Sequence, residues 1–280
     1  MFDYSISAAA VALKNADAVV IGAGAGLSAA AGLDIGIDAV RKIMPDYETK
    51  YGITNLYEGS FYPFPTMAEQ WAYWAKAFYY WRFQVEVFPL YRKLLALAQK
   101  RNYFVITTNG DGQFLRAGFP REKVFLIQGD HGDFACSASC CDETYDSKPI
   151  FENMIAHTEN LRVPDSCLPK CPHCGAPLMM RQRSGVRTLE IAPYCEERQR
   201  YLDFLHDAEG KKTVLLELGV GFNTPVHIKM PFWKLTAEKP EVTYIAVNPE
   251  RPVVPDDISE RTIYLQQSIS DVISSLSGKI

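Results

Sequence analysis

The sequence predicts an α/β fold built on an open parallel sheet, and three observations support this prediction. Short strands rich in β-branched and aromatic residues alternate with helical segments along the 280 residues. The first strand, at 18–21, runs into a glycine turn and a helix that begins near Ser28, as a nucleotide-binding α/β unit does. Polar residues and glycines also follow four later strands, at the carboxyl edge where parallel sheets bind ligands.

The remaining elements follow from periodicity and composition. Small apolar residues predict a helix at 4–15, and the aromatic-rich segment 71–97 predicts one or two helices interrupted at Pro89. Further strands are predicted at 103–107, 124–127, 213–218 and 242–247, and further helices at 196–206 and 268–276. The stretch 134–194 is rich in cysteine and proline without a clear period, so we expect a small lobe that needs a cross-link, such as a disulfide or a bound metal ion, to be stable.

Composition excludes several classes of protein. With 48% apolar and 22% charged residues, the chain has material for a core and is not disordered. A balance of 29 basic and 33 acidic residues gives a net charge of −4, which argues against a dedicated nucleic-acid binder. The N-terminal segment lacks the basic region of a signal peptide, and the apolar run at 18–33 is too rich in glycine and small residues for a membrane span. We therefore expect a cytoplasmic protein whose partners are small ligands or other proteins.

The seven cysteines fall within one stretch of 60 residues, which favours local metal binding in a reducing compartment over a disulfide scaffold. Two pairs from two short loops are suited to a tetrahedral zinc ion, with no position left open for catalysis. The expected ligands of this structural zinc are Cys136, Cys140, Cys171 and Cys174. Cys141 is an alternative to its neighbour Cys140, and His173 is a further alternative that we expect to be a bystander.

The glycine turn at 22–26 has two interpretations. It brings backbone amides to a pyrophosphate at a helix start in many nucleotide-binding folds, but such turns also serve close packing alone. The acidic residue expected after the second strand of a dinucleotide fold is not evident. The other strand ends favour a nucleotide, because four polar ends on one edge are harder to explain as turn or cap residues than one. These ends carry Asn109 and Asp111, Gln128 and Asp130, residues 219–223, and Asn248.

Taken in order, these motifs resemble the sirtuins over nearly the whole chain. They are Gly-Ala-Gly-Leu-Ser at 24–28 with Gly32, Thr-Asn-Gly-Asp-Gly at 108–112, Gln128-Gly129 before a cysteine pair, Gly-Val-Gly-Phe-Asn-Thr-Pro at 219–225, and Asn248. Four further segments are similar to the class M sirtuins, a group linked to macrodomain operons. These segments are Tyr51-Gly52, Gly-Ser-Phe-Tyr-Pro-Phe at 59–64, Trp-Ala-Tyr-Trp at 71–74 and Pro-Phe-Trp at 231–233.

The resemblance implies a sirtuin-like, DHS-like NAD-binding fold, in which a Rossmann-like parallel sheet carries a small zinc-binding lobe and a helical insertion. On this basis we expect a discontinuous NAD-binding lobe formed by 1–34, 95–133 and 196–280. The helical insertion is expected at 35–94 and the zinc lobe at 134–195.

The resemblance also assigns roles by position. The loop 24–28 matches the loop around the NAD diphosphate, Asn109 the asparagine beside the nicotinamide ribose, and Asp111 the acid that holds the nicotinamide carboxamide. Gly219, Gly221 and Asn248 match the loops around the adenosine half. The expected cofactor-binding residues are Gly24, Ala25, Gly26, Ser28, Leu33, Thr108, Asn109, Asp111, Gln128, Gly219, Gly221, Asn223 and Asn248, with Asn109, Asp111 and Gln128 as catalytic residues.

Two departures from the sirtuin pattern bear on the chemistry. Most sirtuins follow the equivalent of Gly32-Leu33 with a Pro-Asp-Phe-Arg run, whereas this chain has Asp-Ile-Gly-Ile at 34–37, with Arg41 a distant substitute for the arginine. Gln128 stands where deacylating sirtuins carry their catalytic histidine. A glutamine amide orients hydroxyl groups through hydrogen bonds but does not titrate near neutral pH, so it does not act as a base.

Breaking the nicotinamide bond needs positioning and electrostatic stabilisation more than a base at this position. We therefore predict transfer of ADP-ribose from NAD to a protein side chain with release of nicotinamide, as the class M resemblance also implies. That resemblance suggests a lipoyl-carrier protein as acceptor and a macrodomain hydrolase as the enzyme that reverses the modification. Two rivals stay open: an NAD-dependent deacylase that uses His131 or a water chain, and a non-catalytic NAD or ADP-ribose sensor.

Two further features of the sequence are better explained by structure than by function. The aromatic residues at 71–81 have the spacing of a core-facing stripe, with the wall of a pocket as the lesser alternative. Arg181, Arg183 and Arg187 are expected to be solvated surface charges rather than a recognition site for an acidic acceptor.

Overall fold

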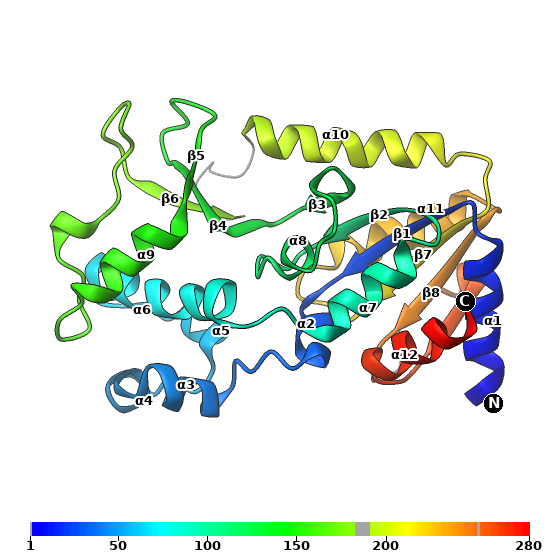
Figure 1. Ribbon diagram of the computed structural model, residues 1–280, viewed down its shortest axis with the longest axis horizontal. Helices are drawn as coiled ribbons and strands as arrows, with labels where there is room; N and C mark the ends of the chain where they lie inside the picture. Colours follow the sequence, from blue (N-terminus) through cyan, green and yellow to red (C-terminus); the bar gives the residue numbers. More distant parts are fainter. Residues whose placement is uncertain (1, 183–190, 251–252) are drawn as a thin grey trace.

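The computed structural model describes residues 2–182, 191–250 and 253–280. Figure 1 shows an elongated molecule with a large sheet and its helices at one end and a three-stranded sheet with a group of helices at the other. The helices α1 (Phe2–Asn15) and α12 (Ile269–Lys279) lie at the end remote from the small sheet.

The large sheet has six parallel strands in the order β3-β2-β1-β7-β8-β9. Counted along the chain, these strands follow the Rossmann order 3-2-1-4-5-6, so the direction of winding reverses between β1 and β7. The strands are β1 (Ala18–Ala23), β2 (Asn102–Thr107), β3 (Val124–Leu126), β7 (Thr213–Leu218), β8 (Val242–Val247) and β9 (Thr262–Leu265). The predicted Rossmann-like parallel sheet is thus confirmed.

Helices cover both faces of this sheet. On one face, α1, α2 (Ala25–Ala31), α7 (Pro89–Ala98) and α12 share a core with Val19 and Ile21 of β1. On the other face, α10 (Ala192–Asp207) and α11 (Lys229–Glu238) share a core with Val20. Because alternate residues of each strand enter different cores, the central strands are apolar at nearly every position. The short helices are α8 (Gln113–Arg116), η2 (Arg121–Lys123), η4 (Pro225–His227) and η5 (Asp256–Arg261).

The small sheet is antiparallel, in the order β5-β4-β6. It consists of β4 (Gly129–Cys136), β5 (Thr144–Asp146) and β6 (Leu178–Gln182), with the helix α9 (Ser147–Ala156) and the turn η3 (Asp165–Cys167) beside it. The register of β4 against β6 shifts between Asp130 and Phe134. Short strands and this bulge explain why the segment shows no sequence period.

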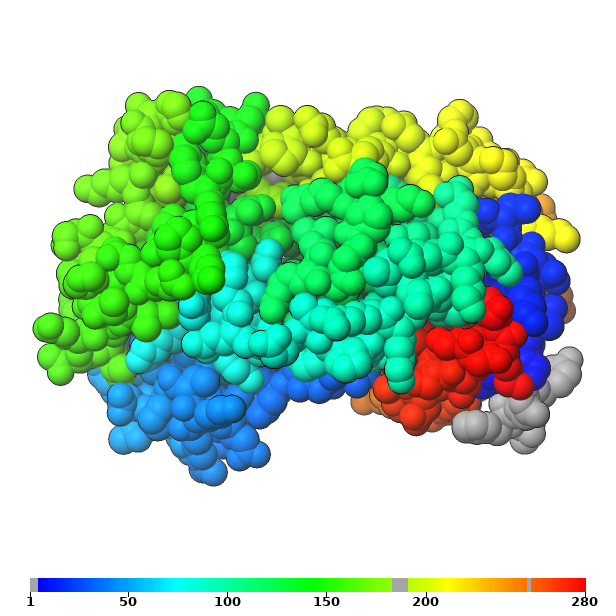
Figure 2. Space-filling view, in the orientation of Figure 1, coloured from blue at the N-terminus to red at the C-terminus, as the bar shows by residue number. Residues whose placement is uncertain are grey.

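The helical insertion packs on the small sheet rather than standing apart from it. Trp71 and Phe78 of the insertion contact Phe134 and Phe151, with ring centroids 5.7 Å apart for Trp71 and Phe134. The aromatic residues at 71–81 are therefore core-facing, as predicted. Figure 2 shows the insertion, in blue and cyan, directly below the green small lobe. Its elements are α3 (Ile37–Ile43), α4 (Pro45–Tyr51), α5 (Leu56–Gly59), α6 (Met67–Tyr79) and the π-helix η1 (Tyr80–Gln84).

The division into three units at 1–34 with 95–133 and 196–280, at 35–94 and at 134–195 stays a prediction.

The prediction that Arg181 is a solvated surface charge is wrong. Its side chain is fully buried on β6, with Nη2 3.1 Å from Asp133 Oδ2 and 4.0 Å from Glu197 Oε1. Two carboxylates make this burial of a charge tolerable. Arg183 and Arg187 lie outside the described residues.

Within the described ranges, none of the helices combines the length and the apolar character that a membrane span requires.

We expect Gly22→Ala to destabilise the fold. A Cβ at this position of β1 would lie 2.5 Å from Ile228 Cγ2 and 2.6 Å from Phe232 Cε2, so α11 would have to move off the sheet. Overpacking of this kind costs about 1–3 kcal/mol, which thermal unfolding will detect. Gly278→Ala is the control, because a Cβ there meets no atom within 4 Å. Equal melting temperatures for the two variants would contradict the packing of α11 on β1.

Candidate functional site

The ends of β1 and β7 meet backbone to backbone at the point where the winding reverses. A Cβ on Gly24 would lie 2.8 Å from the carbonyl oxygen of Gly219, and a Cβ on Gly26 would lie 2.7 Å from Gly219 Cα. The Gly24 amide donates to the Leu218 carbonyl and the Gly26 amide to the Gly219 carbonyl. Of the two interpretations of the glycine turn, close packing therefore accounts for these two glycines. Ala25 between them is exposed.

A buried polar cluster lies beside this contact, at the ends of β1 and β2. Asn109 Nδ2 donates to the Gly24 carbonyl at 2.9 Å and to Ser28 Oγ at 3.2 Å. Ser28 Oγ donates its single proton to Asp111 Oδ2, so the Tyr91 hydroxyl, 2.8 Å from Ser28 Oγ, is the donor in that pair. The hydrogen bonds from Tyr91 and Asn109 to Ser28, and from Ser28 to Asp111, thus run toward the Asp111 carboxylate.

The cluster keeps acceptors available for a ligand. Asn109 Oδ1 accepts no hydrogen bond from the described residues. Asp111 accepts one bond from Ser28 and one from the Gln113 amide at 3.0 Å, which leaves further lone pairs on its two oxygens. Burial raises the pKa of Asp111, while the bonds from Ser28 and Gln113 oppose the rise. The arrangement suits a ligand that presents hydroxyl and amide donors.

The other predicted cofactor residues lie at the same carboxyl edge. Thr108 is half-buried after β2, Gly221 and Asn223 are exposed after β7, and Asn248 is half-buried after β8. The amide of Leu33 donates to the Ser28 carbonyl. Asn248 Oδ1 caps the Glu250 amide, and neither Asn223 nor Asn248 bonds to the Asn109 cluster in the described part of the chain.

Gln128 is half-buried between β3 and β4, and its side chain forms no hydrogen bond with the described residues. His131, three positions on, is held differently. Trp81 Nε1 donates to His131 Nδ1 at 2.9 Å, and the imidazole packs on Phe78. An indole N–H only donates, so the proton of the neutral imidazole sits on Nε2. The pKa of His131 is lowered to about 4, mainly by burial and to a lesser extent by the nearby Arg82, against the opposing effects of Asp130 and of a hydrogen bond with Gln182.

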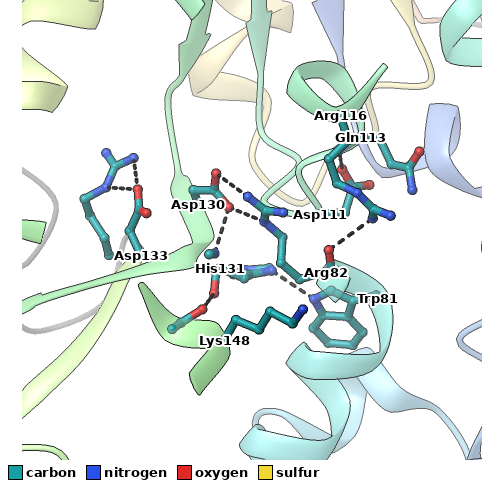
Figure 3. A network of polar contacts seen from close by, with 12 residues as sticks. Trp81, Arg82, Asp111, Gln113, Arg116, Asp130, His131, Asp133 and Lys148 are labelled. Atoms are coloured by element: carbon teal, nitrogen blue, oxygen red, sulfur yellow. Dashed lines mark hydrogen bonds and ion pairs between the residues drawn. The ribbon is translucent and has the colours of Figure 1, made fainter. Parts of the chain in front are cut away.

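Several residues of the site escaped the sequence analysis. Tyr91 was hidden in a helical pattern, and no local motif indicates that Arg82 forms an ion pair with Asp130, one of the predicted strand-end residues. Figure 3 shows Arg82 reaching from η1 toward β4, between Asp130 and Asp111. Arg41, the predicted substitute for the sirtuin arginine, is instead exposed and forms a two-pronged pair with Glu48.

The four predicted metal ligands converge in the small lobe. The sulfur atoms of Cys136, Cys140, Cys171 and Cys174 lie within 4.8 Å of one another, and two of their contacts are 3.5 Å. Four thiolates about 2.3 Å from a tetrahedral zinc ion are about 3.8 Å apart, so this donor set fits structural zinc. Gly175 takes φ +73°, the left-handed conformation that the turn of the knuckle requires.

Cys141 lies outside this set of four. Its sulfur is 3.8 Å from that of Cys140, and it belongs to a second, more exposed group with Glu143 and His173. His173 Nε2 is 3.0 Å from Glu143 Oε2, and this contact raises the pKa of His173. As predicted, His173 is a bystander to the four-cysteine cluster.

Comparison with known proteins identifies the family. A protein ADP-ribosyltransferase of Staphylococcus aureus is 32% identical over 265 residues, which are 94% of this chain and 84% of that protein. The chain belongs to the sirtuin-type protein ADP-ribosyltransferases. A probable bifunctional ADP-ribose hydrolase/ADP-ribosyltransferase of Fusarium oxysporum is 34% identical over 248 residues. That match covers 81% of this chain but 39% of the fungal protein. No model of a protein family matches the chain.

Solved structures show that this transferase has the sirtuin fold. The enzyme Sir2Tm bound to a propionylated peptide superimposes with a TM-score of 0.62 at 15% identity, over 98% of both chains. A Sir2 homologue in complex with NAD superimposes with a TM-score of 0.57 at 16% identity, over 97% of this chain and 92% of the other. The predicted sirtuin-like fold is confirmed.

We expect the purified transferase to hold about one zinc ion per chain, because four thiolates complete a tetrahedral shell. Cys171→Ser should lose the zinc, whereas Cys141→Ser and Cys195→Ser should retain it. Metal analysis by mass spectrometry checks all four proteins. Loss of zinc in Cys141→Ser would show that Cys141 is a ligand, and absence of zinc from the wild type would contradict the site.

Proposed function

We propose that the protein transfers ADP-ribose from NAD to a side chain of an acceptor protein and releases nicotinamide. The observation that carries this proposal is the buried cluster of Asn109, Ser28 and Asp111 at the reversal point of the sheet. The residue at the position of the sirtuin histidine is Gln128, which is no base. Family membership supports the type of reaction, and the cluster supports the place where it occurs.

The polar cluster fits the nicotinamide half of NAD. Asn109 would orient the nicotinamide ribose through its unused Oδ1, and Asp111 would accept a hydrogen bond from the carboxamide. The loops 24–28 and 219–223, with Asn248, would surround the diphosphate and the adenosine half, as their likeness to sirtuins suggests. Bound NAD supplies the ADP-ribosyl group and nicotinamide as the leaving group.

The residues around Gln128 favour transfer over deacylation. Gln128 would orient a ribose hydroxyl or the acceptor by hydrogen bonds, without taking a proton. His131, the candidate base of the rival deacylase, already accepts the Trp81 hydrogen bond on Nδ1, its basic nitrogen. A deacylase of this architecture needs a base that titrates near neutral pH, and His131 is not suited to that task.

We further propose a lipoylated carrier protein as the acceptor and a macrodomain hydrolase as the opposing enzyme. Both proposals come from the likeness to class M sirtuins. The name of the fungal relative, which combines an ADP-ribose hydrolase with an ADP-ribosyltransferase, supports a hydrolase as counterpart.

Asn109→Ala should reduce transfer by at least about a hundredfold, because the ribose loses its orienting group. The assay uses NAD labelled in the adenosine half, with a carrier protein that is or is not lipoylated. Label is expected on the lipoylated form, with an equal amount of nicotinamide released. Asn102→Ala, which changes an exposed asparagine at the opposite end of β2, should leave transfer unchanged. Release of an acyl group without labelling would indicate a deacylase, and NAD binding without nicotinamide release would indicate a sensor.

The rate of transfer should show no ionisation near pH 6.5 that depends on His131. Because the pKa of His131 is lowered to about 4, the imidazole is already neutral at about pH 6 and does not change charge between there and pH 8. The rate is measured over that range for the wild type and for His131→Gln. A step near pH 6.5 that disappears in His131→Gln would show that His131 is the base and would favour the deacylase.

A further inference from the structure

Arg82 forms a buried ion pair that joins the helical insertion to the small sheet. Its Nε lies 2.7 Å from Asp130 Oδ1 and its Nη2 lies 3.2 Å from Asp130 Oδ2, a two-pronged geometry. The Gly132 amide donates to Asp130 Oδ1 at 2.8 Å. The side chains of Arg82 and Asp130 are 14% and 2% exposed, so water screens the pair only weakly.

The guanidinium group lies in a slot between two glycines. A Cβ on Gly112 would lie 2.4 Å from Arg82 Cζ, and a Cβ on Gly132 would lie 2.6 Å from Arg82 Nη2. Gly112 directly follows Asp111 in the loop after β2, and Gly132 belongs to β4. One planar cation therefore touches the loop that carries Asn109 and Asp111 and the first strand of the small sheet.

The backbone that carries Arg82 is itself fixed by the large lobe. Arg82 lies in the π-helix η1, a helix type that is rare and often found at functional sites. From α8, Arg116 donates to the carbonyls of Arg82 and Val85 at 3.1 and 2.8 Å. Gln113, also on α8, bonds to the backbone at 86 and 88. Figure 3 shows Arg116 and Gln113 on the side of Arg82 opposite Asp130.

We propose that Arg82 is a positioning residue for the nicotinamide end of the NAD site, which it serves by clamping the loop 109–112 against β4. This inference rests on the proposed function, in which Asp111 holds the nicotinamide carboxamide. Arg82 does not contact the reacting groups itself. It would fix the position of Asp111 and supply a positive charge beside it.

The charges around Asp111 make this role measurable. Among the described residues, four ionisable side chains from four elements interact electrostatically with Asp111. They are Tyr91 of α7, Arg82 of η1, Arg116 of α8 and Asp130 of β4. Burial raises the pKa of Asp111, Asp130 raises it further, and Arg82 lowers it. Loss of Arg82 therefore raises the pKa of Asp111 by removing its effect and by leaving Asp130 without its counter-ion. Asp111 would then take up a proton at higher pH and lose its charge there.

The test is the affinity for NAD, measured by titration calorimetry between about pH 4.5 and pH 8. Arg82→Met should weaken NAD binding about tenfold at neutral pH, because the loop loses its clamp. The pH below which binding is lost should rise by about one unit, because an opposite charge is removed. Arg82→Lys keeps the charge but not the two-pronged contact, so its binding should weaken about threefold while the pH midpoint stays near that of the wild type. Arg82→Met combined with Asp130→Asn removes both charges and should return the midpoint toward the wild-type value.

Arg121→Met is the matched control. It breaks a 2.8 Å contact with Glu197, whose side chain is 1% exposed, at α10 rather than at the loop 109–112. It should lower the melting temperature without changing NAD affinity or its pH midpoint. If Arg82→Met behaves in the same way, Arg82 is merely structural and the proposal is overturned. Should Arg82→Met not fold, Arg82→Lys and the double variant decide the question through the same two quantities.

Asp111→Asn separates this inference from the proposal on which it rests. Unchanged NAD affinity in Asp111→Asn would show that the nicotinamide pocket is assigned wrongly. Weakened binding in Asp111→Asn together with normal binding in Arg82→Met at every pH would leave the pocket in place and overturn only the role of Arg82.

Discussion

The contact between the backbones of Gly24, Gly26 and Gly219 is the constraint on which the site depends. It brings the ends of β1 and β7 into direct backbone contact at the point where the winding of the sheet reverses, with no side chain between them. It also places the Gly24 carbonyl where Asn109 Nδ2 binds it, and Asn109 in turn binds Ser28. A methyl group on any of the three glycines would separate β1 from β7 and move the cluster with them. One contact between main chains thus aligns both halves of the proposed NAD site.

In the described part of the chain, some buried charges have an oppositely charged partner and one does not, and the unpaired charge lies at the proposed site. Asp130 is paired with Arg82, and Arg181 is paired with Asp133. Asp111 is buried near the first of these pairs but forms no ion pair with the described residues, and hydrogen bonds from Ser28 and the backbone amide of Gln113 stabilise its charge. Keeping a buried carboxylate without a direct counter-ion costs stability, and proteins retain such groups where they bind or react. The arrangement leaves Asp111 able to accept hydrogen bonds from a ligand.

The sequence was sufficient for five strands of the large sheet, but not for its edge strand β9 or for the parts that depend on distant contacts. The strands β7 and β8 begin and end where predicted, because strands buried on both faces are apolar at nearly every position. The four zinc ligands were also predictable, since thiolate pairs in short loops form a local pattern. The strand β4 was missed because Gly129, His131 and Gly132 resemble a loop in sequence. Only the bulge and the neighbouring η1 explain why these residues are there.

The arginines also show that a single sequence does not predict contacts between distant residues. Arg41 and Arg181 looked like a cofactor ligand and a surface charge, yet one is exposed and the other buried. Arg82 carried no signal, because its partners Asp130, Gly112 and Gly132 are at least 30 positions away in the chain. The environment of a long charged side chain is set by tertiary packing, which a single sequence does not display. Sequence motifs therefore indicate residues that we propose to contact NAD, but they do not indicate Arg82, which we propose to hold them in place.

The environment of His131 explains why this histidine is not suited to act as the base of a deacylase. A proton could be added only at Nδ1, which would break the hydrogen bond from Trp81. The resulting cation would lie near Arg82, which lowers the pKa of the ring, while the carboxylate of Asp130 opposes this effect. Burial adds a third penalty, since the ring packs on Phe78 and Trp81. Burial and the Trp81 hydrogen bond are thus the main reasons why the imidazole stays neutral, because the effect of Asp130 on its pKa opposes that of Arg82. Both features favour a site that positions its substrates without a base.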